Sequence, residues 1–295
     1  MKPDPTELAH ILDTDGNFRV IRRLEERSRY NDDDGSEKFL GIYLDVECTG
    51  LDYARESIIE LGMIRFEYSR EGKIFRVLET FDEYEDPGVP IPPFITALTG
   101  ITDEMVDGKR IDDEAVKAFI EDASIVIAHN AGFDRKFMEK RFPVFAGKSW
   151  GCSQREVPWD EEGIESFKLE YIAYRMGFFY EGHRADIDCR AGLEALSRPL
   201  PRSNQLPLAI LLENAGKTTY LIWAIGSPYE TKDILRERGY RWSPGGDGRL
   251  KSWYKEVDSG DKDAEIKFLK DEIYVKAVEP RVDKVTSLER YSDRV

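Results

Sequence analysis

The stretch FLGIYLDVECTG, residues 39–50, decides the fold of this chain. It is a β-rich apolar run that ends in charge and a Thr-Gly turn, as expected for a buried central strand. Asp45 and Glu47 are two residues apart, so their side chains leave the strand on the same face. A buried strand rarely holds two such carboxylates, since each must be neutralised, paired or bound to a metal. An edge strand with one wet face would explain them too, but burial is indicated by Ile42, Leu44 and Val46.

The segments that follow alternate between strand and helix patterns. Residues 57–68 and 73–81 predict two strands joined by a turn, which favours an antiparallel hairpin. A short buried strand is predicted over 124–129. Helices are predicted over 112–123, directly after 129, over 169–177 and over 185–198. A hairpin followed by helix–strand–helix alternation predicts an α/β domain with a mixed sheet.

Composition shifts divide the chain of 295 residues into four parts. The segment 197–207 contains three prolines and few apolar residues, so we place a domain boundary there. We expect an N-terminal extension with one hairpin, a main domain, a small accessory α+β domain and a disordered tail. Their predicted bounds are 1–37, 38–199, 205–278 and 279–295.

Charge and cysteine content narrow the function classes. No apolar run approaches the roughly 20 residues that span a bilayer, and the N-terminus lacks the pattern of a secretory signal. The three cysteines form no CxxC spacing, which fits a reducing compartment, so we expect a cytoplasmic protein with no membrane partner. The net charge of −15 argues against nucleic-acid binding, because phosphate contacts need lysine and arginine. The excess of acids lies in residues 1–199, however, since residues 200–295 carry 17 basic and 16 acidic side chains. Net charge alone therefore does not exclude a nucleic-acid partner.

Two further segments carry acidic residues at predicted helix starts. Asp134 lies in AHNAGFDRKF, and His183 precedes Asp188 in EGHRADIDC. Taken singly, each acid could serve the helix dipole, and Asn130 could be a helix N-cap. Together with the strand acids they could hold two Mg²⁺ ions, which favour carboxylate oxygens and clamp a phosphoryl displacement. His183 is suited to accept a proton near neutral pH.

The order YLDVECTGL … AHNAGFDRKF … HRADIDC resembles the three exonuclease motifs of the DEDD superfamily over residues 39–198. The histidine five residues before the last aspartate points to its histidine-containing branch, which includes the proofreading subunit of bacterial DNA polymerase III. The resemblance implies a ribonuclease H-like fold, with a five-stranded mixed sheet flanked by helices. It also implies 3′→5′ exonuclease activity with two divalent cations, Mg²⁺ or Mn²⁺.

The resemblance assigns roles to five residues of this sequence. Asp45 would bridge both cations, Glu47 and Asp188 would complete the first site, and Asp134 would hold the second ion. His183 would be the general base. Asp186 is a rival for Asp188, but the spacing of the family motif favours Asp188.

A substrate cleft beside the cations is implied as well. Leu51 would pack against the terminal base, and the backbone at Thr49 and Gly50 would face the terminal nucleotide. For Phe133, four residues after His129, a place in the core explains the residue equally well. The residues implied to line the cleft are Thr49, Gly50, Leu51, His129, Asn130 and Phe133.

Residues 229–255 combine a net charge of +3 with interleaved aromatic residues. Cations and stacking rings together hold single-stranded nucleic acid. Alternatively, Trp242 and Trp253 form the core of a small domain that needs large side chains.

The predicted function is a DNA 3′→5′ exonuclease acting on single-stranded or mismatched 3′ ends. A 3′→5′ exoribonuclease is the alternative, because nothing in the sequence reads a 2′-hydroxyl. A non-catalytic nucleic-acid-binding module is disfavoured, since all five residues of the motif are present. The expected partner is nucleic acid, DNA before RNA, and a DNA polymerase or another replication or repair protein is a further candidate.

Overall fold

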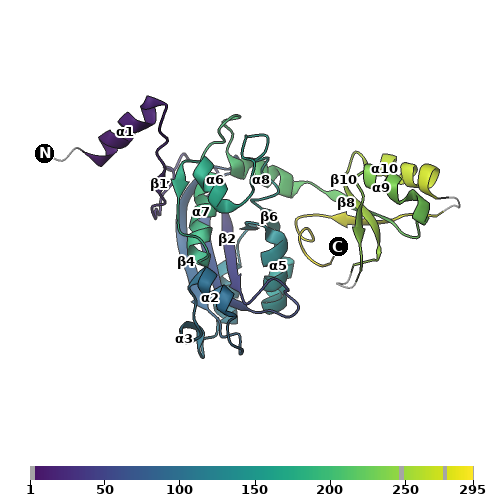
Figure 1. Ribbon diagram of the computed structural model, residues 1–295, viewed down its shortest axis with the longest axis horizontal. Coiled ribbons are helices and arrows are strands. Elements are labelled where there is room, and N and C mark those ends of the chain that lie inside the picture. Colours follow the sequence, from purple (N-terminus) through teal and green to yellow (C-terminus); the bar gives the residue numbers. More distant parts are fainter. Residues whose placement is uncertain (1–3, 246–248, 275–277, 295) are drawn as a thin grey trace.

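The computed structural model describes residues 4–245, 249–274 and 278–294. Its centre is a five-stranded sheet in the order β4-β3-β2-β5-β6 (Figure 1). The middle strand β2, Phe39–Cys48, pairs antiparallel with β3 and parallel with β5. This mixed sheet confirms the predicted ribonuclease H-like fold and makes residues 39–48 a central strand, not an edge. The other strands are β3 (Ile58–Tyr68), β4 (Ile74–Tyr84), β5 (Ile125–Ala128) and β6 (Trp150–Cys152).

Helices cover both faces of this sheet. Helices α6 (Leu169–Arg175), α7 (Ala185–Ser197) and α8 (Pro207–Gly216) share one apolar core with Tyr43 and Ile127. Helices α4 (Asp113–Ile120) and α5 (Ala131–Arg141) share the opposite core with Leu44 and Val126. Strand alternation therefore places the odd-numbered residues of β2 on the α7 face. Short helices α2 (Pro93–Thr99) and α3 (Asp103–Val106) pack beside the sheet, and 143–147 form a 3₁₀ turn.

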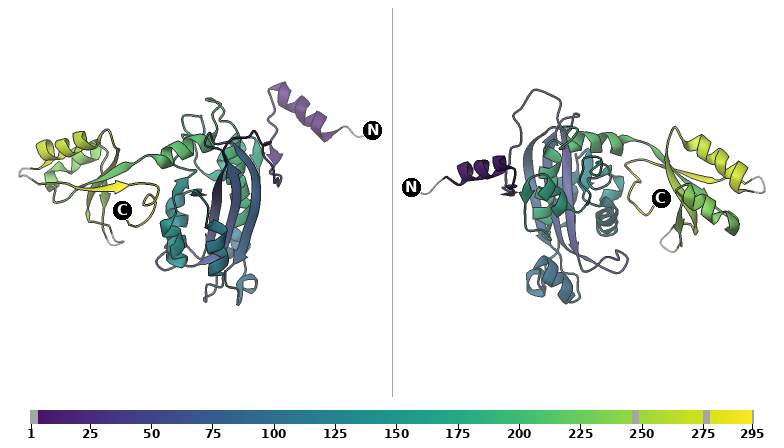
Figure 2. Two further views of the ribbon diagram at one scale, coloured as in Figure 1. Left: turned by 180° about the vertical axis from the view of Figure 1, so that it is seen from behind. Right: turned by 45° about the horizontal axis from the view of Figure 1, so that its top comes forward.

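A second, four-stranded sheet follows in the order β11-β8-β10-β9. Its core contains Leu235 of α9 (Lys232–Glu237) and residues that flank α10 (Lys262–Phe268), so both helices lie on one face (Figure 2). Trp253 contributes to this core, which confirms the structural interpretation of that tryptophan, whereas Trp242 is half exposed. The strands are β8 (Thr219–Ala224), β9 (Arg241–Ser243), β10 (Ser252–Asp258) and β11 (Arg281–Val285).

Three boundaries differ from the expectation. The first is the N-terminal extension, which forms helix α1 (Pro5–Asp15) and a short strand β1 (Arg22–Arg23) instead of a hairpin. Strand β1 pairs in parallel with β7 (Phe178–Phe179) of the main domain. The second is α8, expected to open the accessory domain. Its Leu208 and Leu211 belong to the main core, because the helix packs beside β6.

The third difference is the C-terminal segment, where the prediction of disorder over 279–295 is wrong for residues 279–294; residue 295 lies outside the described residues. Residues 281–285 form strand β11, paired antiparallel with β8. Arg290 is only 8% exposed, and its guanidinium donates to Glu156 and to the carbonyls of Asn214, Ala215 and Lys217. A polar composition was therefore compatible with order, because strand pairing and arginine hydrogen bonds replace apolar burial.

Within the described residues, each helix is too short or too polar to cross a bilayer.

Replacing Gly192 by alanine tests the packing of α7 on the sheet. A Cβ at this position would overlap the phenol oxygen of buried Tyr43, whose hydroxyl is hydrogen-bonded to Ser153. We expect Gly192→Ala to lower the free energy of unfolding by about 1–3 kcal/mol, the usual cost of overpacking. The control is Gly216→Ala, where an added Cβ meets nothing within 4 Å. Urea titrations of both variants would contradict the close packing if the two curves shifted equally.

Candidate active site

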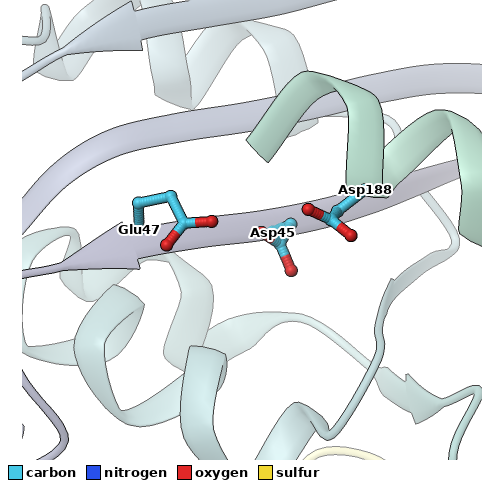
Figure 3. A group of neighbouring side chains, drawn as sticks. All are labelled: Asp45, Glu47 and Asp188. Carbon is cyan, nitrogen blue, oxygen red and sulfur yellow. The ribbon is translucent and has the colours of Figure 1, made fainter. Parts of the chain in front are cut away.

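Three carboxylates meet where strand β2 approaches the start of α7. Asp45 and Glu47 leave β2 on the α7 face, and Asp188 projects from the first turn of α7. One oxygen from each lies within 4.8 Å of the other two. Figure 3 shows these three side chains side by side, two from the strand and one from the helix. The rival Asp186 instead pairs with Arg190 at 3.7 Å, so the structure brings Asp188 to the cluster.

A glycine allows this approach. Gly62 of β3 lies directly beside Asp45 in the strand register. A Cβ at Gly62 would be 2.5 Å from the carbonyl carbon of Ala185 and 2.7 Å from the nitrogen of Asp186. The backbone at the start of α7 therefore rests on β3, at a distance that only glycine permits.

Asp134 reaches the same strand from the other layer. It lies in the first turn of α5 and is 2% exposed. Its Oδ1 accepts a hydrogen bond from the backbone N–H of Val46 at 3.3 Å, between Asp45 and Glu47 along the chain. The four carboxylates proposed from sequence are thus gathered around the last residues of β2.

Burial and mutual repulsion oppose the ionisation of these acids. Burial, followed by the charges of Asp134 and Asp188, raises the pKa of Asp45 well above its usual range. Burial raises the pKa of Glu47 to about 8, with Asp188 next in effect, and also raises the pKa of Asp134 to about 8. Among the described residues, no lysine or arginine forms an ion pair with Asp45 or Glu47. Oxygen donors left without a cationic partner are the set that suits hard divalent cations.

Asp188 and His183 are joined through the backbone. Asp188 accepts the N–H groups of His183 at 2.7 Å and Arg184 at 3.2 Å, and the hydroxyl of Tyr180 at 2.9 Å. His183 has a positive φ of 67° and its side chain is 45% exposed. Its Nε2 lies 3.6 Å from a carboxylate oxygen of Glu170. The imidazole is therefore half exposed and faces Glu170, while the backbone of the same residue holds Asp188.

A buried ion pair that the sequence analysis missed holds the start of α7. Glu60 of β3 is fully buried and accepts two hydrogen bonds from the Arg184 guanidinium, at 2.7 and 2.9 Å. Its other oxygen accepts the N–H of Ala185 at 2.9 Å. A glutamate inside the apolar run SIIELGMI was the available signal, since a charge there must be paired. Glu60 and Arg184 position the residues on either side, His183 and Asp188.

The predicted substrate contacts divide into two groups. Leu51, Asn130 and Phe133 line one cleft of about 710 Å³, together with Tyr53 and Lys136. Leu51 is 87% exposed, which leaves its apolar side chain open to a ligand. Asn130 occupies the N-cap position of α5 in left-handed backbone, but its side chain makes no capping bond. Phe133 packs on Phe137 with ring centroids 4.8 Å apart, so it serves both the core and the cleft.

Thr49, Gly50 and His129 are not among the residues that line this cleft. The Thr49 hydroxyl donates to Glu56 and accepts from the Ser57 N–H, which closes the turn after β2. Both ring nitrogens of His129 are engaged, Nδ1 with Ser153 and Nε2 with the Phe167 carbonyl. Burial also lowers the pKa of His129 to about 4, so the ring is neutral near pH 7.

A mixed sheet that gathers carboxylates at the end of its central strand has the ligand set of a hydrolase that uses divalent cations. A family profile described as "Exonuclease" matches residues 42–196, more than half of the chain, and the protein belongs to this exonuclease family.

Two similar proteins are DNA polymerases III of the PolC type. The chain is 27% identical over 184 residues to that of Caldanaerobacter subterraneus subsp. tengcongensis, and 32% identical over 161 residues to that of Clostridium perfringens. These matches cover 58% and 52% of this chain, but only 12% and 11% of the polymerases. A solved structure, "Exonuclease X in complex with 5′ overhanging duplex DNA", is 23% identical with a TM-score of 0.40, covering 52% of this chain and 89% of the other.

The raised pKa of Glu47 predicts how stability changes with pH when metal is removed. In the folded state Glu47 has a pKa of about 8, above its usual 4.5. The contribution of this group to the free energy of unfolding is therefore fully present at low pH and is lost as the pH rises to about 8. In EDTA, Glu47→Gln should therefore gain stability over the wild type as pH rises, on the order of 3 kcal/mol near pH 8. Denaturant titrations between about pH 5 and 8 measure this difference, and adding Mn²⁺ should reduce it. Parallel pH profiles would contradict the crowding.

Glu60→Gln tests the positioning role of the buried ion pair. The substitution leaves the Arg184 guanidinium without its carboxylate and loosens the start of α7, so the Asp188 oxygens lose their fixed place. We expect Mn²⁺ affinity to fall by about 10-fold, the usual effect of removing a group that orients a ligand. The control is Glu67→Gln. Glu67 lies on the same strand as Glu60, and its ion pair with Arg76 of β4 is away from α7. Calorimetric titration of both variants decides: equal affinities would exclude the positioning role.

Proposed function

We propose that this protein is a 3′→5′ exonuclease that hydrolyses terminal phosphodiester bonds of DNA at single-stranded or mismatched 3′ ends. The observation that carries the proposal is the group of Asp45, Glu47 and Asp188 at the end of β2, with buried Asp134 hydrogen-bonded to Val46 beside it. The pKa of each acid is raised, and among the described residues no lysine or arginine forms an ion pair with Asp45 or Glu47. Such a site has little use in stabilising the fold, since its charges repel. It becomes favourable when cations bind there and a phosphate is drawn to them.

Asp45, Glu47, Asp134 and Asp188 would hold two divalent cations, Mg²⁺ or Mn²⁺. These ions would polarise the scissile phosphate and stabilise the charge on the attacking and leaving oxygens. As the family resemblance implies, Asp45 would contribute to both ion sites, Glu47 and Asp188 would complete one of them, and Asp134 would hold the other ion. The fixed Asp188 carboxylate, held by backbone N–H groups and Tyr180, supports a preorganised site.

His183 is the proposed general base. A neutral imidazole nitrogen accepts the proton of the attacking water, which raises its nucleophilicity as it approaches the phosphorus. The exposed imidazole lies on the segment whose backbone N–H binds Asp188, so it belongs to the same cluster. The bond between the phosphorus and the 3′ oxygen breaks. This oxygen stays on the shortened polymer, and the released terminal nucleotide carries the phosphate.

Leu51, Asn130 and Phe133 are proposed to hold the terminal nucleotide. Exposed Leu51 offers an apolar surface to a base, and Phe133 offers a ring beside it. The 3′→5′ direction of degradation and the preference for DNA are proposed on the family resemblance, with RNA as the alternative substrate. The similarity to PolC-type polymerases supports a DNA polymerase as a proposed partner.

The decisive experiment is a time course with single-stranded DNA and RNA labelled at the 3′ or the 5′ end, in Mg²⁺, Mn²⁺ or EDTA. We expect metal-dependent release of mononucleotides from the 3′ end. Asp45→Asn should reduce turnover to background, because the shared ligand is lost. His183→Gln should lower kcat by about 10²–10⁴-fold with metal affinity retained, the range for a lost general base.

Asp186→Asn is the matched control, since this carboxylate lies two residues before Asp188 on the same helix, is not part of the three-carboxylate group, and pairs with Arg190. Its activity should equal that of the wild type. Full activity of Asp45→Asn, or release from the 5′ end, would refute the proposed function. Faster degradation of RNA would move the proposal to an exoribonuclease.

A further inference from the structure

The cleft that Leu51 and Phe133 line continues onto the second sheet. One wall comes from the exonuclease domain and includes Leu51, Phe133 and Lys136. The other wall comes from the second sheet, and residues 290–292 of the C-terminal segment also line the cleft. Figure 1 shows that this segment runs between the main domain and the second sheet. We call this space the basic cleft. Its lining from the second sheet and adjoining segments includes Lys217, Leu221, Trp223, Arg241, Arg249, Tyr254, Glu256 and Asp258.

The face of the second sheet that meets the cleft is the face that α9 and α10 leave uncovered. The core under those helices uses Ile222, Ala224 and Val257. Residues of opposite parity point the other way, and there the strands align a row of side chains. Trp223 opposes both Arg281 and Tyr254, and Tyr254 opposes Arg241. Across four neighbouring strands the row therefore reads arginine, tryptophan, tyrosine, arginine.

The two rings of this row have different tasks. Trp223 is 2% exposed and donates its indole N–H to Asp283 at 2.9 Å. Its ring lies 5.2 Å from that of Tyr254, at 39°. Trp223 thus fixes Tyr254, which is partly exposed and lines the cleft. A supported ring with an open side is a stacking platform for a base.

The charge of the basic cleft is opposite to that of the protein. The whole chain carries a net −15, yet the cleft is lined by six lysines and arginines against three acids. Arg290 is paired with Glu156, Lys136 with Asp293 and Lys217 with Glu213. Arg155 and Arg241 lie exposed in the lining. A positive cleft with a stacking ring on an acidic protein suits a polyanion that carries bases.

The basic cleft begins beside the residues that flank the carboxylates along the chain. Phe133 lines the cleft and directly precedes Asp134, and Leu51 lines it and follows the strand that carries Asp45 and Glu47. The four carboxylates themselves are not among the lining residues. A polynucleotide whose terminal nucleotide lies against Leu51 and Phe133 can therefore extend through this cleft to the second sheet.

We infer that the open face of the second sheet binds the single-stranded segment of the substrate on the 5′ side of the scissile bond. A base stacks on Tyr254, and Arg241 contacts a phosphate. This inference rests on the proposed exonuclease function and extends it: the second sheet is the part of the enzyme that holds single-stranded polymer while the end is removed. It places on the open face of the sheet the single-strand binding that the cations and aromatic residues of 229–255 suggested from sequence.

Binding by the full-length chain tests the inference apart from catalysis. The Asp45→Asn protein is titrated with labelled oligothymidylates of 4 to 24 nucleotides, and with oligouridylates of the same lengths. Adding Arg241→Glu or Tyr254→Ser should raise the Kd of the long oligomers by about 10-fold and that of the tetramer much less. Arg241→Glu should also reduce the salt dependence of binding by about one phosphate contact.

Two controls lie on the helix-covered side of the same sheet. Arg236→Glu changes an exposed arginine of α9, and Trp242→Ser removes a half-exposed ring whose strand position opposes Trp253, away from the cleft. Both should bind every oligomer as the parent does. Thermal unfolding of all variants verifies that the sheet is intact.

The outcomes separate the two proposals. If wild type releases nucleotides from 3′ ends but Arg241→Glu and Tyr254→Ser bind long oligomers normally, the inference is refuted and the proposed function stands. An equal loss on short and long oligomers would also refute it, since the defect would then lie at the active site. If long oligomers bind through Tyr254 and Arg241 but wild type hydrolyses no polymer with Mg²⁺ or Mn²⁺, the exonuclease proposal fails while the binding surface stands. The inference would also be overturned if this face bound no oligonucleotide and was instead covered by a protein partner.

Discussion

The crowding of carboxylates at the end of β2 is the constraint on which the rest of the structure depends. Asp45, Glu47, Asp134 and Asp188 come from one strand and two helices, and burial raises the pKa of each. Repulsion among them favours separation of the layers, so other interactions must hold the layers in place. The site therefore destabilises the fold that holds it, as is usual where the charges of a functional site must be preorganised.

The opposing interactions lie mostly at the start of α7. Gly62 lets the backbone at the start of α7 rest on β3, and Gly192, further along α7, leaves room for the Tyr43 ring. The Glu60–Arg184 pair then fixes the first residues of the helix, where His183 and Asp188 lie five residues apart. On the other layer, Arg135 follows Asp134 and donates to the carbonyls of Ser287, Leu288 and Arg290. The C-terminal segment thus anchors α5, which carries the fourth carboxylate.

Sequence reasoning found the central strand and the acids because both depend on local pattern. An apolar run containing two acids of like parity specifies a buried strand and a charge problem at once, and the motif order supplies the partners of Asp45 and Glu47. It missed Glu60, because one glutamate in a strand is ambiguous until its arginine, 124 residues later, is placed beside it. It also predicted disorder for residues 279–295, because their stability comes from backbone pairing and arginine–carbonyl bonds that composition does not record.

The same distinction between local and summed properties explains how an acidic chain can serve a polyanionic substrate. Net charge acts over long distances and is screened beyond about 10 Å at 0.1 M salt, whereas phosphate contacts are made within a few ångströms. The chain gathers acids at the β2 site, where cations can reverse their effect, whereas in the basic cleft the lysines and arginines outnumber the acids. It places exposed arginines and one supported tyrosine along that cleft. Under the proposed function, a polyanionic substrate would be attracted both to cations held by the carboxylates and to the basic cleft, in spite of the net charge of the chain.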